Sequence, residues 1–187
     1  MIKFLNNSMY EPYINFRKSY LEALNANQTL IQAASISSYC SDEKEVHSRF
    51  VNIKFVDDDK FIFFSNLNSP KAKQFEKHKQ ISVNFLWTSI NLQIRILAYI
   101  SKTSHNYNQA YFKTRDPKKN ALAISSNQSS KIDSFSLVEK KFKDVLDHEN
   151  LENCPNHWGG FVFTPYTFEF WRGNKFRLNK RDLYSKK

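Results

Sequence analysis

Residues 81–100 read ISVNFLWTSINLQIRILAYI, a stretch in which apolar and polar residues alternate. Apolar residues occupy every second position from Ile81 to Trp87, and the alternation resumes after a short connection. A period of two is typical of a strand with one buried face, so the stretch predicts two successive strands. In the second strand, the alternation places Gln93 and Arg95 on the face opposite the apolar set.

Further strands are expected on both sides of this stretch. Asp57, Asp58 and Asp59 form a turn cluster between two apolar runs, which predicts a hairpin. The expected strands cover residues 30–37, 47–56, 61–64, 81–87, 92–100, 157–164, 167–172 and 176–178, with a last short strand near Leu183.

Helices are expected before and between these strands. Pro12, followed by Phe16, Tyr20, Leu21 and Leu24 at helical spacing, predicts an opening amphipathic helix. The other helices are expected at residues 69–79, 104–114, 120–125 and 136–148, the last with Leu137, Phe142, Val145 and Leu146 turned inward.

This order of elements predicts a mainly β chain, an antiparallel barrel or sheet with helices packed outside. A doubly wound parallel sheet would need a helix after every strand. The chain has 187 residues and shows no repeat or linker, so we expect one domain over residues 1–187. Residues 1–26 would carry the N-terminal helix, and residues 157–187 would carry the last strands.

The composition excludes several kinds of site. Only three glycines occur, whereas Walker loops and dinucleotide fingerprints need glycines where the backbone approaches phosphate. A phosphate would therefore be held by side chains. The two cysteines, Cys40 and Cys154, have no metal-like spacing, so we expect neither a disulfide framework nor a metal site.

Charge and hydropathy bear on partners and location. Lys and Arg number 28 against 18 Asp and Glu, a formal net charge of +10. The lysines are scattered and no RNA-binding signature is present, so a nucleic-acid partner is not expected. The N-terminal stretch lacks the apolar run of a signal peptide, and no run approaches the roughly 18 residues of a membrane span. We expect a cytoplasmic protein without a membrane partner.

Arginine marks one stretch near the C-terminus. Its planar fork binds phosphate or carboxylate through two parallel hydrogen bonds, which lysine cannot do. Three arginines crowd into WRGNKFRLNKR, residues 171–181, beside Trp171. The stretch is interpreted either as a solvated basic strand end or as a site for an anion or a planar ring.

Five segments carry a family resemblance: SRFVNIK (48–54), FFSNLNSPKA (63–72), NQSS (127–130), WGGFVF (158–163) and EFWRGNKFRLNKRDLY (169–184). In this order and spacing they resemble the pyridoxamine 5'-phosphate oxidase family of FMN-dependent flavoproteins, over nearly everything from Pro12 to Tyr184. The resemblance implies a six-stranded antiparallel split barrel. Residues 157–187 would complete its cofactor site. It also implies a homodimer that holds FMN at the subunit interface.

The resemblance also implies the cofactor contacts. FMN presents a phosphate dianion, which needs cations and hydroxyl donors. It also presents a flat flavin with polar edges, where amides can both donate and accept hydrogen bonds. Taken singly, Gln93 also fits an exposed strand residue, and Trp171 also fits a core anchor. The implied FMN contacts are Arg49, Phe50, Val51, Asn52, Ile53, Lys54, Phe64, Ser65, Lys71, Gln93, Gln128, Ser129, Trp171 and Arg181.

The substrate contacts follow from the same resemblance. The substrate phosphate would be bound by Lys54, Tyr111, Arg115 and Lys119, and the pyridine ring by Arg177 and Asn179, the expected catalytic residues. Tyr111 and Arg115 are four residues apart, so we expect them on one face of a helix. That pair also fits a stabilised surface helix.

Three positions depart from the family pattern. Lys119 replaces a serine and can still donate to phosphate. Asn179 replaces a histidine, so it can hydrogen-bond the ring hydroxyl but cannot titrate near neutral pH. Pro70 replaces an arginine, which removes one cation near the cofactor phosphate.

The implied reaction is oxidation of pyridoxamine or pyridoxine 5'-phosphate to pyridoxal 5'-phosphate in vitamin B6 salvage, with dioxygen reduced to hydrogen peroxide. Two alternatives stay open. One is a related FMN-dependent oxidase with a different substrate, as in phenazine biosynthesis, because Lys119 and Asn179 both lie on the substrate side. The other is a flavin-binding protein without turnover.

Overall fold

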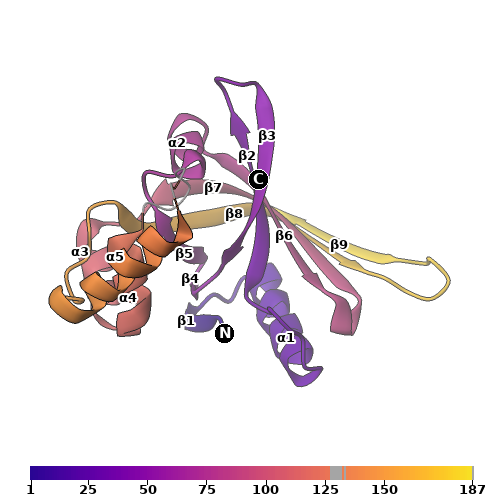
Figure 1. The fold of residues 1–187 in the computed structure, drawn as a ribbon. Helices are drawn as coiled ribbons and strands as arrows, with labels where there is room; N and C mark the ends of the chain where they lie inside the picture. The colour runs from indigo at the N-terminus through magenta and orange to yellow at the C-terminus, as the bar shows by residue number, and fades with distance from the viewer. Residues whose placement is uncertain (127–131, 133, 187) are drawn as a thin grey trace. The chain divides into compact units, whose positions relative to one another are not determined.

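A computed structural model of the chain describes residues 1–126, 132 and 134–186. The described strands are β1 (Lys3–Asn7), β2 (Ala33–Cys40), β3 (Glu45–Asn52), β4 (Phe55–Asp58), β5 (Lys60–Asn66), β6 (Gln80–Trp87), β7 (Leu92–Lys102), β8 (Trp158–Arg172) and β9 (Lys180–Ser185) (Figure 1). The helices are α1 (Glu11–Asn25), α2 (Pro70–Lys77), α3 (His105–Lys113), α4 (Pro117–Ser125) and α5 (Phe135–His148), with a short 3-10 helix at Thr88–Ile90.

The strands form one sheet in the order β1-β4-β5-β8-β7-β6-β2-β3, and β9 pairs with β8. Pairing is antiparallel for β2/β3, β2/β6, β4/β5, β6/β7 and β8/β9, whereas β1 runs parallel to β4. The mainly β class with additional helices is confirmed. The described chain has nine strands instead of the implied six, because short strands such as β1 and β4 extend the sheet at its end.

The chain divides into two compact units. Unit 1 comprises Met1–Phe63, Gln74–Ser101 and Phe161–Lys187, and unit 2 comprises Phe64–Lys73 and Lys102–Gly160. Each unit has buried apolar side chains of its own. In unit 2, Phe112, Ala123, Cys154 and Trp158 form a buried cluster.

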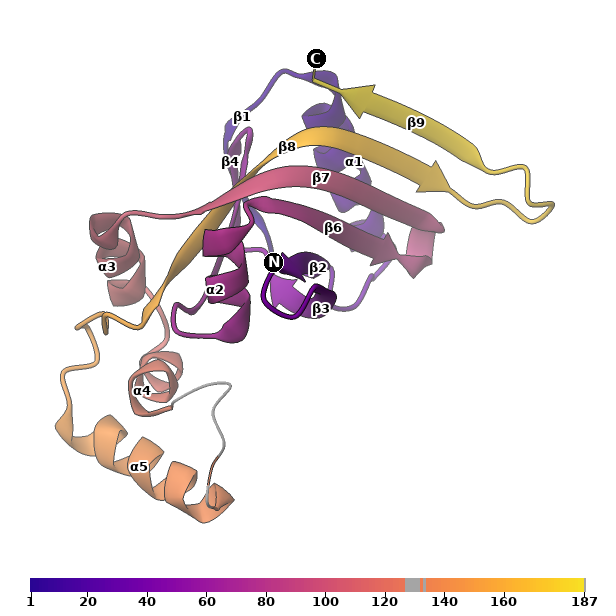
Figure 2. The same ribbon diagram turned by 90° about the horizontal axis from the view of Figure 1, so that it is seen from above.

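The core of unit 1 forms where α1 packs against the sheet. Figure 2 shows β6, β7, β8 and β9 side by side. Phe16 of α1 is fully buried, and its ring centre lies 5.0 Å from that of Phe61, 5.1 Å from Phe85 and 5.5 Å from Trp87. The apolar face predicted for residues 81–87 is therefore the face that α1 covers.

Residues 47–56 form two strands, where one was predicted. β3 pairs with β2, whereas β4 pairs with β5. Between them, Ile53 N donates to Gln32 O (2.9 Å), and Lys54 N donates to Ile62 O (2.8 Å). The chain changes its pairing partner here without interrupting the extended apolar pattern, so the pattern alone does not reveal the break.

Two C-terminal predictions were wrong. Residues 158–172 form one strand, β8, where two strands were predicted at 157–164 and 167–172; the burial alternation slips by one position between Tyr166 and Thr167 without ending the strand. Residues 176–178 are not a strand, since Arg177 has φ 59° in the turn between β8 and β9. Residues 30–32, predicted as the start of a strand, form a turn before β2.

The hairpin at the aspartate cluster and the predicted helices are confirmed. β4 and β5 pair directly across a turn in which Asp58 has φ 50°, a conformation that Asp tolerates. α4 begins three residues earlier than predicted because Asp116 caps it. In α5, Val145 is buried as expected, but Leu137 is 55% exposed.

None of the described helices is long and apolar enough to cross a membrane.

Candidate functional site

Arg49, the first residue of the predicted FMN segment, lies in a hydrogen-bonded cluster within unit 1. Its Nη1 donates to the Ser38 hydroxyl (2.6 Å) and to the Ile36 carbonyl (3.3 Å). Its Nη2 donates to Oε1 of Gln74 (2.8 Å). Arg49 is therefore fixed both by the neighbouring strand β2 and by helix α2.

The charge of Arg49 has no carboxylate partner in the part of the chain that the structure describes. Its acceptors are all neutral, whereas Arg172, for example, forms an ion pair with Glu22 (3.0 Å). Burial lowers the pKa of Arg49, because desolvation disfavours the charged form. A partly buried cation without a counterion fits an anionic group such as the phosphate of FMN.

The residues that follow Arg49 differ in what they offer a ligand. Phe50 is 78% exposed, and Val51 and Lys54 are half-buried. Ile53 is fully buried in the core, so only its main chain is available to a ligand. Their assignment to FMN stays a prediction.

Ser65 and Lys71 belong to unit 2. Ser65 lies near the end of β5 and Lys71 is the second residue of α2; both are half-buried. Pro70 begins α2, where proline removes no hydrogen bond and its fixed φ suits the first turn. Pro70, which the resemblance places where the family has an arginine, therefore suits its position in the helix.

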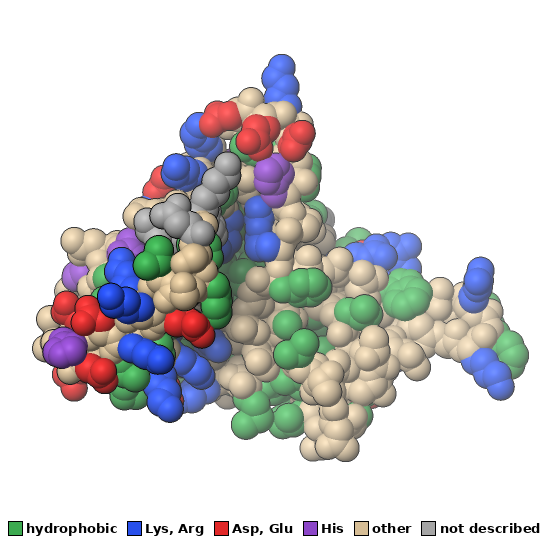
Figure 3. Space-filling view, in the orientation of Figure 1, with side chains coloured by type: hydrophobic (Ala, Val, Ile, Leu, Met, Phe, Trp, Pro, Cys, Tyr) green, Lys and Arg blue, Asp and Glu red, His purple; other side chains and the backbone are tan. Residues whose placement is uncertain are grey.

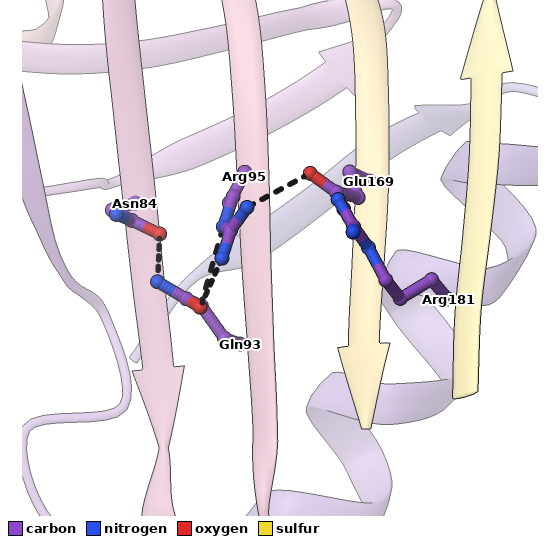
Figure 4. Close-up of polar contacts among 5 residues, drawn as sticks. All are labelled: Asn84, Gln93, Arg95, Glu169 and Arg181. Carbon is purple, nitrogen blue, oxygen red and sulfur yellow. Dashed lines mark hydrogen bonds and ion pairs between the residues drawn. The ribbon is translucent and has the colours of Figure 1, made fainter. Parts of the chain in front are cut away.

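Gln93 and Arg181 are connected by polar contacts that cross four strands (Figure 4). Gln93 Nε2 donates to Asn84 Oδ1 (3.1 Å), and Gln93 Oε1 accepts from Arg95 (3.3 Å). Glu169 accepts from Arg95 Nη1 (3.2 Å) and from Arg181 Nε (2.5 Å). Two predicted flavin contacts thus belong to one network, and neighbouring side chains orient both.

A cavity of about 540 Å³ in unit 1 brings together three predicted residues, Trp171, Arg177 and Asn179. The remaining lining residues are Leu86, Thr88, Asn91, Gly173, Asn174 and Lys175. Among the residues that the structure describes, this lining contains two cations and no Asp, Glu or His. Asn179 Oδ1 accepts from the backbone N of Asn174 (3.3 Å), so its amide also holds the β8–β9 loop.

Arg115 lies against an aromatic cluster in unit 2. Its guanidinium carbon is 4.4 Å from the ring centre of Trp158 and 5.3 Å from that of Phe112. The rings of Tyr111 and Phe64 stack with centres 4.1 Å apart. This cluster therefore brings together two residues assigned to the substrate, Tyr111 and Arg115, and one assigned to FMN, Phe64.

One donor of Arg115 lacks a partner among the described residues. Nη2 donates to the Lys119 carbonyl (3.3 Å), whereas Nη1 is buried and makes no hydrogen bond. Burial lowers the pKa of Arg115, although nearby groups oppose this shift. Leaving a buried charged donor unsatisfied is costly, so Nη1 fits an acceptor such as a phosphate oxygen.

The prediction that Tyr111 and Arg115 share one helix face was wrong. α3 ends two residues before Arg115, and Pro117 begins the next helix. Lys119 lies in the first turn of α4 with its side chain exposed. Lys54, the fourth residue assigned to the substrate phosphate, belongs to unit 1. Gln128 and Ser129 lie outside the described residues.

The two glycines of WGGFVF allow a close approach inside unit 2. A Cβ at Gly160 would lie 2.6 Å from Thr103 Oγ1 and 3.0 Å from Phe64 Cε1. Asn108, which is buried, accepts from Gly160 N (2.8 Å). Because the glycines lack side chains, β8 can approach the aromatic cluster closely.

Sequence reasoning missed the residues that orient the predicted binding residues, namely Ser38, Gln74 and Glu169. Gln74 had a weak signal, because it follows Lys71 by three residues and shares its face of α2. Ser38 and Glu169 had no signal in the sequence, since their roles depend on pairing across strands.

A second cavity of about 490 Å³ in unit 1 is lined by α1 and by strands that include β8 and β9. Several polar side chains of its lining bind one another: Arg172 donates two hydrogen bonds of 3.0 Å to Glu22, and Tyr184 donates to Glu11 (3.0 Å). We assign no ligand to it.

Glu43, Glu45 and His47 lie at the end of the β2–β3 hairpin, where Figure 3 shows acidic side chains beside a histidine. Their ligand atoms lie within 4.8 Å of one another. The His47 ring is 3.2 Å from the Glu43 carboxylate and 3.3 Å from that of Glu45. The two glutamates are exposed, and we assign no metal to this cluster.

Comparison with known sequences gives consistent matches. A family model described as pyridoxamine 5'-phosphate oxidase matches residues 22–149. A second, described as pyridoxine 5'-phosphate oxidase C-terminal dimerisation region, matches residues 158–187. Pyridoxine/pyridoxamine 5'-phosphate oxidase 1 of Hydrogenovibrio crunogenus is 35% identical over 179 residues, 94% of this chain and 82% of the relative. The oxidase of Nostoc punctiforme is 34% identical, with the same coverage of both chains.

Solved structures confirm the expected fold class. PhzG from Burkholderia lata, in complex with tetrahydrophenazine-1-carboxylic acid, has a TM-score of 0.88 at 21% identity and covers 95% of this chain and 87% of its own. A pyridoxamine 5'-phosphate oxidase-related, FMN-binding protein from Nostoc punctiforme has a TM-score of 0.69 at 10% identity, covering 91% of this chain and 97% of its own. At these identities the likeness concerns the fold alone.

Proposed function

Because this chain belongs to the pyridoxamine 5'-phosphate oxidase family, we propose that it converts pyridoxamine or pyridoxine 5'-phosphate to pyridoxal 5'-phosphate in vitamin B6 salvage. It is an FMN-dependent oxidoreductase. The chemistry that FMN supplies when bound is acceptance of a hydride, with dioxygen as the final oxidant and hydrogen peroxide as its product. The names of the relatives from Hydrogenovibrio crunogenus and Nostoc punctiforme support this substrate class.

Side chains would hold the cofactor. The unbalanced charge of Arg49 fits the FMN phosphate, and Ser65, Lys71 and Ser129 would add donors to it. The flavin would lie against polar and aromatic groups of the sheet. Its proposed contacts are Phe64, Gln93, Gln128, Trp171 and Arg181, together with the segment from Phe50 to Lys54.

The observation that carries the substrate proposal is the buried, unpaired Nη1 of Arg115. A substrate phosphate would accept its hydrogen bond, with Tyr111, Lys119 and Lys54 as further donors. Arg177 would hold the pyridine ring, and Asn179 would hydrogen-bond its hydroxyl group. All of these residues position the substrate, and none of them activates it. This suits a reaction in which the cofactor performs the difficult step.

Proton handling near the ring is limited by the residues present. The described lining of the cavity beside Arg177 contains no Asp, Glu or His, so it offers no carboxylate or imidazole that could take up or release a proton near neutral pH. We propose that Arg177 holds the ring in place while Asn179 fixes its orientation.

The C-terminal match to a dimerisation region points to a homodimer. Several large apolar side chains on the strands of unit 1 are exposed, among them Phe50 (78%), Leu86 (62%) and Leu183 (67%). A second copy would cover such side chains and bury apolar area. We propose that residues 1–187 act as one FMN-binding domain in this dimer, with FMN at the subunit interface.

A related oxidase with a different substrate is the second candidate. The described lining of the cavity beside Arg177 also contains Lys175 and no acidic group, which suits a ring that bears a carboxylate. PhzG from Burkholderia lata is in complex with a molecule of this kind, tetrahydrophenazine-1-carboxylic acid.

The test is turnover by the FMN-loaded protein. From pyridoxamine 5'-phosphate, dioxygen and water, we expect pyridoxal 5'-phosphate, hydrogen peroxide and ammonia in equal amounts. Peroxide formed only with a ring carboxylate as substrate would support the second candidate. A protein that binds FMN but oxidises neither would be a flavin-binding protein without turnover.

A further inference from the structure

We propose that Gln74 and Ser38 are positioning residues that hold Arg49 ready for the FMN phosphate, an inference that rests on the proposed function. Neither residue was assigned a role by the family resemblance. Ser38 is 2% exposed and Gln74 is 5% exposed, so both are buried polar residues, and their hydrogen bonds need an explanation.

The chemistry of the three side chains fixes the direction of each hydrogen bond. A guanidinium only donates, so Oε1 of Gln74 must face Arg49 Nη2 (2.8 Å). The Ser38 hydroxyl accepts from Arg49 Nη1 (2.6 Å), and its own proton therefore goes to Gln74 Oε1 (2.6 Å). The three groups form a closed ring of hydrogen bonds with one arrangement of protons.

The ring orients Arg49 without neutralising it. Of the five N–H groups of a guanidinium, three donate to Ile36, Ser38 and Gln74, which leaves two. All three acceptors are uncharged, so the positive charge remains for a ligand. Pre-orientation by neutral groups lowers the entropy lost when the guanidinium binds a phosphate.

The identity of residue 74 is therefore important. A carboxylate at this position would accept the same hydrogen bond, but it would form a buried ion pair with Arg49 and compete with the cofactor phosphate. An apolar side chain of similar length would leave the charge intact and remove only the orientation. The two substitutions separate charge from orientation.

The experiment compares FMN with riboflavin, which lacks the phosphate. Dissociation constants of both flavins would be measured by flavin fluorescence quenching for the unmodified protein, Gln74→Glu, Gln74→Met and Ser38→Ala. We expect Gln74→Glu to weaken FMN binding by about tenfold or more, and Gln74→Met and Ser38→Ala by about three- to tenfold. Riboflavin binding should stay unchanged in all three.

Gln80→Glu is the matched control, because it makes the same chemical change at an exposed position of unit 1. It should leave both constants unchanged. A parallel loss of FMN and riboflavin binding in the buried variants would show a structural role only and overturn the inference. So would an unchanged FMN preference in Gln74→Glu. If the unmodified protein binds neither flavin, the proposed function itself fails. Ser38→Ala adds no charge and gives an independent reading if Gln74→Glu does not fold.

Discussion

The guanidinium carbon of Arg115 lies 4.4 Å from the ring centre of Trp158, while its Nη1 has no hydrogen-bond partner among the described residues. Stacking on an indole holds the planar guanidinium in place at a modest gain in free energy. The arginine is thus oriented by an uncharged group, and its charge stays available.

Arg115→Ala should raise the KM for pyridoxamine 5'-phosphate by roughly 10- to 100-fold, because a charged hydrogen bond to phosphate contributes about 1.5–3 kcal/mol. The FMN dissociation constant should not change. Steady-state kinetics and flavin titration measure the two quantities. Lys113→Ala, which removes an exposed cation from α3, is the control. An unchanged KM in Arg115→Ala would remove the proposed phosphate anchor.

Gly160→Ala should lower the free energy of unfolding by about 1–3 kcal/mol, the usual cost of overpacking. The added methyl group would lie 2.6 Å from Thr103 Oγ1, which itself hydrogen-bonds the buried Asn108 (2.5 Å) and cannot easily move. Urea unfolding measures the change. Gly173→Ala, whose methyl group would come no closer than 3.1 Å to the Trp171 ring, should cost less. Equal costs at the two positions would contradict this account.

The fold was predictable where its cause is local. Alternation in residues 81–100 and the aspartate turn at 57–59 each act over a few residues, and both predictions are confirmed. The break at Ile53 was not predictable, because a change of pairing partner depends on strands far away in the sequence. Arg177 was misplaced in a strand because its left-handed conformation has no glycine to mark it.

The site was predictable only through resemblance. Composition left the stretch beside Trp171 open between a solvated basic strand end and an anion or ring site, and the structure places Trp171 and Arg177 in the lining of one cavity. The residues that orient Arg49 and Arg181 contact them across strands or from a helix, and no short-range pattern encodes such contacts.

Asn179→His should introduce an ionisation near pH 6–7 into the profile of kcat/KM. The described lining of the cavity contains no histidine, so the unmodified protein should lack this ionisation. The measurement is the ratio of kcat/KM for Asn179→His to kcat/KM for the unmodified protein, between pH 5.5 and 8.5. Asn179→Gln keeps an amide and is the control. A flat ratio for Asn179→His would show that residue 179 does not interact with the reacting ring.

Cys154 should react slowly with a disulfide reagent at pH 8. Burial raises the pKa of its thiol to about 11, and the thiolate is the reactive form. At pH 8 about one thiol in a thousand is then ionised, and the rate should rise about tenfold for each pH unit up to pH 10. The Cys40→Ser variant isolates Cys154, and unfolding in urea gives its unprotected rate. A rate in the native protein equal to the unfolded rate would contradict the burial of Cys154 beneath the aromatic cluster that holds Arg115.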